Sequence, residues 1–100
     1  MGRDEALEVA AALRPLVERE RCLVVGVEQQ ATSYYLGCGA EQTRTQGAEI
    51  PAEVTAAEAA GWDVVAVFPE PPARGSFLAS WQAFDVPGLP DDLTAYRPPG

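Results

Sequence analysis

The spacing of apolar residues predicts that the chain begins with an amphipathic helix. In residues 3–21, apolar side chains recur three or four positions apart at Val9, Leu13 and Leu16, with charged residues between them. This spacing turns one stripe of a helix toward the core. Pro15 lies inside the segment and has no amide N–H, so we expect the helix to bend or restart there.

Four later segments are rich in the β-branched and aromatic residues that favour strands. They are residues 22–27, 33–38, 62–68 and 76–84. A second helix is predicted over residues 50–61, because Pro51 suits a first helical position and Gly61 suits the position just past a helix end. An alternative start is Thr55, which would form a capping box with Glu58.

The first two predicted strands are close enough in sequence to form a hairpin. If Glu28 pairs with Ser33, one face of the hairpin is wholly apolar or aromatic, made of Leu23, Val25, Val27, Tyr34, Leu36 and Cys38. A shift of one residue would bring Cys22 opposite Cys38, but it would mix polar residues into that face. The first register therefore predicts that the two cysteines point to opposite faces and are free thiols, as suits a reducing cytoplasm.

The predicted element order, α-β-β-α-β-β, indicates an α+β domain. We expect a four-stranded, mainly antiparallel sheet with two helices on one face, formed by residues 1–84. Residues 85–100 contain four prolines and are predicted to be a Pro-rich C-terminal tail, either packed on the sheet or separate from it.

Strand alternation predicts an apolar strip on the sheet face away from the two helices. Its residues are Val24, Tyr35, Val65, Val67, Leu78 and Phe84. Exposed apolar strips often mark interaction sites, so these six are the predicted partner-binding residues. The alternative is that the Pro-rich tail covers the strip.

The sequence lacks two residue types on which much enzyme chemistry depends, histidine and lysine. This excludes imidazole bases, lysine Schiff bases and the lysine of a phosphate-binding loop. Fifteen residues separate the two cysteines, which does not match zinc-site spacing, and no calcium-loop pattern occurs. We therefore expect no metal and no cofactor. The fifteen acidic residues allow many carboxylate pairs that could act in acid–base chemistry, and the sequence selects none of them.

The formal net charge is −8, and the seven arginines are scattered along the chain. This charge argues against direct binding of nucleic acid or of an anionic membrane, and it permits a basic protein partner. No apolar run reaches the ~18 residues of a membrane span, and the N-terminus lacks an apolar signal core. We expect a cytoplasmic protein of a bacterium or a phage-infected cell.

Small size, acidity and the missing catalytic residue types favour a non-enzymatic protein-binding module. It would act by occluding a basic protein partner, as an inhibitor, an immunity protein or a phage anti-defence factor does. One alternative is a homo-oligomeric domain, such as a homodimer, or an accessory structural domain of a larger bacterial assembly. A third is a small carboxylate-based ligand-binding domain or enzyme.

Overall fold

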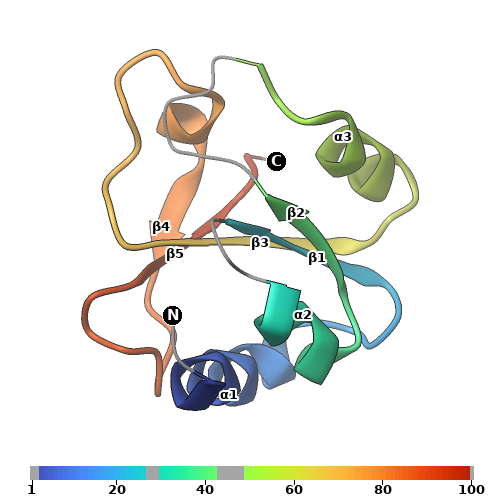
Figure 1. The fold of residues 1–100 in the computed structure, drawn as a ribbon. Helices are drawn as coiled ribbons and strands as arrows, with labels where there is room; N and C mark the ends of the chain where they lie inside the picture. Colours follow the sequence, from blue (N-terminus) through green and yellow to red (C-terminus); the bar gives the residue numbers. More distant parts are fainter. Residues whose placement is uncertain (1–2, 27–29, 43–48, 100) are drawn as a thin grey trace.

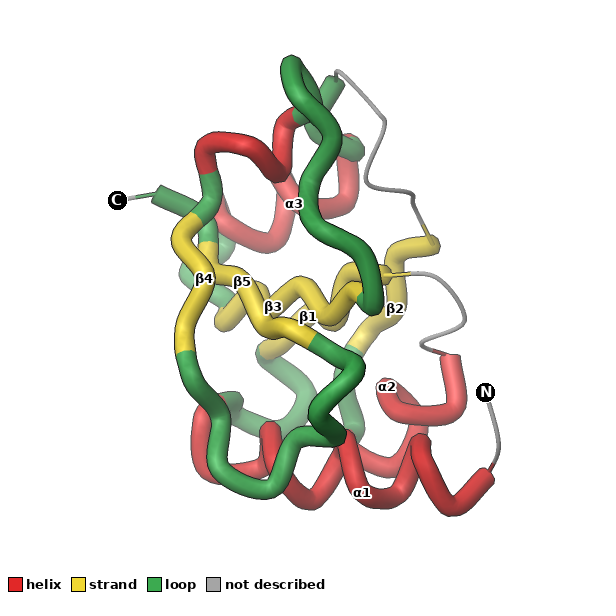
Figure 2. Tube along the Cα trace, turned by 90° about the vertical axis from the view of Figure 1, so that its left-hand side faces the viewer, coloured by secondary structure: helices red, strands yellow, loops and turns green. Residues whose placement is uncertain are grey.

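In the computed structural model, the described residues are 3–26, 30–42 and 49–99, and they form a mixed sheet between two layers of helices (Figures 1 and 2). The elements, of which η1 and η2 are 3₁₀ helices, are α1 (Arg3–Leu13), η1 (Arg14–Leu16), β1 (Cys22–Gly26), α2 (Gln30–Leu36), β2 (Gly39–Gln42), α3 (Ala52–Ala59), β3 (Asp63–Phe68), η2 (Phe77–Ser80), β4 (Gln82–Phe84) and β5 (Thr94–Arg97). Among these residues, no helix has both the length and the apolar character needed to cross a bilayer.

The strands of the described residues form one five-stranded sheet in the order β2-β1-β3-β5-β4. Strand β1 is parallel to β2 and to β3, whereas β5 is antiparallel to β3 and to β4. The predicted α+β class is confirmed. The predicted sheet of four mainly antiparallel strands is corrected to a mixed sheet of five.

Helices cover both faces of the sheet, not one face as the sequence predicted. Helices α1 and α2 lie on one face, while α3 and η2 lie on the other (Figure 2). The two parallel crossovers explain this arrangement. The chain crosses from β1 to β2 through α2 and then returns past β1 to β3 through α3, in the opposite direction. Because such crossovers are almost always right-handed, opposite directions place the two helices on opposite faces.

Each face of the sheet has its own hydrophobic core. On β3, Val64, Ala66 and Phe68 face α3 and η2, while Val65 and Val67 face α1 and α2. Residues 22–26 of β1 are likewise all buried. The predicted alternation along β3 is therefore correct. Both sets of side chains are covered, as is usual for strands that pair in parallel.

The predicted hairpin is wrong, because residues 33–36 belong to α2 and not to a strand. Val27 and Glu28, which the hairpin register invoked, lie outside the described residues. Strand β2 begins only at Gly39 and pairs in parallel with β1, with Leu23 opposite Gly39.

This register places Cys22 beside Cys38, and the two form a disulfide with their Cα atoms 4.9 Å apart. That separation is within the usual range for disulfides. The prediction of two free thiols is therefore wrong. The argument for a reducing compartment that rested on free thiols no longer applies.

Both predicted helices are present, with their ends set by proline and glycine. Helix α1 stops at Leu13 and continues as the single 3₁₀ turn η1, which contains Pro15. Helix α3 begins after Pro51, so the alternative start at Thr55 is wrong. Gly61 has a φ of +77° and follows the last residues of α3, as predicted.

The C-terminal part of the chain differs most from the prediction. Of the segment predicted to be a strand, residues 76–84, only Gln82–Phe84 form one (β4), because residues 77–80 form η2. Residues 94–97, predicted to lie in a tail, form β5 between β3 and β4. The tail thus contributes an interior strand, while residues 69–75 form an irregular connector as predicted.

Candidate functional site

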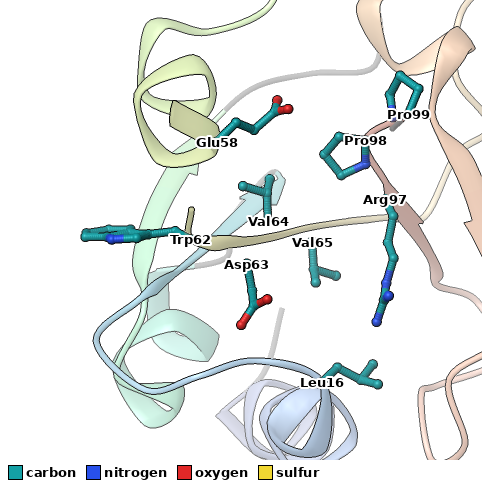
Figure 3. A pocket seen from close by; sticks show the side chains of 9 residues that line it. All are labelled: Leu16, Glu58, Trp62, Asp63, Val64, Val65, Arg97, Pro98 and Pro99. Atoms are coloured by element: carbon teal, nitrogen blue, oxygen red, sulfur yellow. The ribbon is translucent and has the colours of Figure 1, made fainter. Parts of the chain in front are cut away.

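Two hollows open on either side of the Trp62 side chain. The first, here called the Arg97 hollow, has a volume of about 380 Å³. It is lined by Leu16, Glu58, Trp62, Asp63, Val64, Val65, Arg97, Pro98 and Pro99 (Figure 3). The second, here called the α3 groove, has a volume of about 320 Å³ and is lined by Leu23, Glu53, Ala56, Ala57, Ala60 and Trp62. Trp62 is common to both.

The turn that ends α3 fixes the position of Trp62. The Gly61 N–H donates to the Glu58 carbonyl at 3.0 Å, and the Trp62 N–H donates to the Ala57 carbonyl at 2.9 Å. These two bonds form a Schellman motif, which needs the left-handed backbone of Gly61. The motif holds Trp62 just before β3, where its side chain is 38% exposed and points away from the centre of the Arg97 hollow (Figure 3).

The α3 groove exists because the residues of α3 and β2 next to Leu23 have small side chains or none. Ala56 and Ala60 are exposed on the helix, one turn apart, and Leu23 on β1 lies opposite Gly39 on β2. A Cβ atom at Gly39 would lie 3.3 Å from Cδ1 of Leu23, a tight contact. Missing side chains on α3 and β2 therefore leave an apolar channel beside the edge strand.

Glu53 is the charged residue of the groove lining, and it forms a pair with Glu41 of β2. Burial raises the pKa of the half-buried Glu41, and the negative charge of Glu53 and a hydrogen bond with it raise that pKa further. A hydrogen bond between two carboxyl groups requires a proton on one of them. The causes of this shift are burial and Glu53 alone, and they include no basic side chain. The sequence did not indicate which acidic residues lie close together, and the structure places Glu41 and Glu53 next to each other.

We expect Glu41→Gln to stabilise the protein near neutral pH. Because folding raises the pKa of Glu41 above its ordinary 4.5, the folded state binds more protons, and stability falls as pH rises from about 4.5 through the folded pKa. Glutamine keeps the hydrogen-bond donor and has no charge to lose. Thermal unfolding should show a higher Tm than wild type at about pH 7, with the difference shrinking toward about pH 4.

The exposed Glu49→Gln variant is the matched control, since it changes net charge equally without touching the pair. If Glu49→Gln and Glu41→Gln shifted Tm by the same amount at both pH values, the effect would come from net charge and the pair would have no part in it.

Two of the three charged residues that line the Arg97 hollow, Asp63 and Arg97, are engaged within the fold. The backbone N–H of Glu18 donates to Oδ2 of Asp63 at 2.8 Å. The Arg97 guanidinium lies over the ring of Phe84, 4.6 Å from its centroid. These contacts fix the segment before β1 and join β5 to β4.

The six predicted partner-binding residues do not form an exposed strip. Val24, Val65, Val67 and Leu78 are buried, while Tyr35 and Phe84 are half-buried. The expected exposure is wrong because α1, α2 and the segment with Val86 and Leu93 cover that face. Leu78 lies in the opposite core, with Phe77 and Trp81, because η2 is a helix and not a strand.

Sequence reasoning missed the surface around Trp62. The sequence predicted a strand that includes Trp62, but β3 begins at Asp63, and Trp62 before it is 38% exposed. A usable signal was present. A tryptophan directly after a helix-ending glycine, and following an alanine-rich helix, stands at a corner where few side chains can cover it.

No protein-family model matches the chain, and neither the curated proteins nor the solved structures include a significant match. Among the described residues, no group of three or more His, Cys, Asp or Glu side chains is arranged to hold a metal ion.

Proposed function

We propose that this protein is a small, acidic, non-enzymatic protein-binding module that occludes a basic surface of a protein partner. Its mode of action would be that of an inhibitor, an immunity protein or a phage anti-defence factor. The observation that supports this is the exposed indole of Trp62 beside an apolar groove, which is also lined by Glu53, the partner of Glu41.

This combination matches the usual composition of binding hot spots. Tryptophan is enriched among the residues that carry most of the binding energy, particularly where it can pack into a partner. Carboxylates around such an anchor speed the approach of a basic protein and disfavour acidic ones. The net charge of −8 adds a long-range attraction for basic proteins.

The disulfide bears on where the module would work. A Cys22–Cys38 bond persists in oxidising surroundings such as a periplasm or an extracellular space. This favours an oxidising compartment over the cytoplasm that the sequence suggested. The basic partner would then be a protein of the same compartment.

Selection from a random displayed-peptide library tests the proposal without a known partner. Peptides enriched on the wild-type protein should be rich in arginine and lysine. Trp62→Ala should weaken their binding roughly tenfold or more, as for a hot-spot residue. Their affinity should also fall as salt is added.

Leu7→Ala is the matched control, because Leu7 is similarly exposed at 43% but lies on α1, across the sheet from α3 (Figure 2). The proposal is overturned if the selected peptides are neutral or acidic, or if Trp62→Ala and Leu7→Ala have equal effects on binding.

A further inference from the structure

The α3 groove has the length and lining of a channel for one long side chain. Glu53, Ala56 and the C-cap residue Ala60 lie on one face of α3, and the seven steps from Glu53 to Ala60 rise about 10 Å along the helix axis. Trp62 lies at one end and Glu53 at the other, with Leu23 beneath. An occupant must therefore be apolar along most of its length.

The charge of the groove is concentrated at the Glu53 end. Glu53 lines the groove, and Glu41 of β2 is hydrogen-bonded to it. The two carboxyl groups offer several acceptor oxygens to a cation. An occupant should therefore carry a positive charge at its far end.

Arginine matches this arrangement better than lysine does. Its methylene stem can lie along apolar surface while the charged head reaches polar groups. Its planar guanidinium has five donors, so it can contact two carboxyl groups at once, and it is more weakly hydrated than an ammonium. Two carboxyl groups on neighbouring elements suit such a fork.

We propose that the α3 groove receives one arginine side chain of the basic partner, with the stem between Leu23 and the alanines of α3 and the guanidinium at Glu53 and Glu41. The inference rests on the proposed function and specifies its central contact. The partner backbone would enter at Trp62, whose indole packs on it.

Binding of a capped arginine amide, followed by ¹H–¹⁵N NMR, tests the inference directly. The probe should shift the amide signals of Ala56 and Ala60, whereas capped citrulline amide, which is its uncharged isostere, should bind at least several-fold more weakly. Glu53→Gln should weaken arginine binding roughly three- to tenfold, since it removes a charged acceptor. Ala56→Leu should abolish binding by filling the groove.

Two variants on the same helix provide matched controls. Glu58→Gln makes the same charge change beside the Arg97 hollow, and Ala59→Leu adds the same bulk at an exposed position outside the groove. Neither should change arginine binding.

The inference is overturned if citrulline binds as well as arginine, or if Ala56→Leu has no more effect than Ala59→Leu. It is also overturned if Glu58→Gln weakens binding in place of Glu53→Gln, because arginine would then occupy the Arg97 hollow. In that last case the peptide selection could still succeed, so the proposed function would stand without this contact.

Discussion

Replacing Cys22 and Cys38 together with alanine should lower the free energy of unfolding by about 3 kcal/mol. The disulfide spans a sequence separation of 16 and closes the segment that runs from β1 through α2 to β2. A cross-link of this length restricts the unfolded chain, which is the main source of its stabilising effect. Urea denaturation followed by tryptophan fluorescence would measure the loss.

The size of this effect follows from the size of the domain. Domains of this kind are stable by only about 5–15 kcal/mol in total, and a chain of 100 residues has a modest core. Losing about 3 kcal/mol would therefore move the urea midpoint substantially.

A reducing agent provides the internal control for the disulfide. It should lower the urea midpoint of the wild-type protein to that of the double variant and leave the double variant unchanged. The prediction fails if reduction does not move the wild-type midpoint, or if a thiol reagent detects two free cysteines in unreduced, denatured protein.

The same bond has a consequence for the proposed arginine site. It joins the start of β1 to the residue before β2, next to the Leu23–Gly39 pair at the floor of the α3 groove. The floor of the groove is therefore anchored covalently at one end, which holds the channel in shape before any partner arrives.

Hydrophobic spacing predicted the elements with strong periodicity. The helices around residues 3–16 and 52–59 and the strands at 22–26 and 63–68 all agree with the pattern. The segment 33–38 failed because its tyrosines favour a strand locally, while its tertiary contacts favour a helix. Leu36 packs in the core with Val9 and Leu13 of α1, and this packing outweighs a weak local preference.

Alternation revealed which residues share a face, but not what covers that face. Val65 and Val67 were correctly separated from Val64 and Ala66. Their cover comes from α1 and α2, and the placement of α2 depends on a parallel crossover that a hairpin reading excludes. Because α2 was predicted to be a strand, Val65 and Val67 were predicted to be exposed and to bind a partner, whereas they are buried.

The candidate site could not be predicted from the sequence, for a related reason. The Glu41–Glu53 pair and the groove join residues of β1, β2 and α3, so they exist only once the strand order is known. Residue types alone selected no pair among fifteen acids.

Replacing Ala95 with aspartate should destabilise the protein by roughly 3 kcal/mol or more, whereas Thr94→Asp should cost less than about 0.5 kcal/mol. Ala95 is 0% exposed, on β5, and packs in the core that contains Leu13 and Val67. A carboxylate there would lose its water without gaining a partner. Thr94, its neighbour on the same strand, is exposed.

The comparison of these two variants separates an interior strand from a tail. Both add one negative charge to adjacent positions, so net charge and local composition are matched, and urea denaturation would measure the difference. If residues 94–97 were a tail on the surface, the two substitutions would cost equally little. A large loss at Ala95 alone is the result expected when this side chain lies in the core, as it does in β5 between β3 and β4.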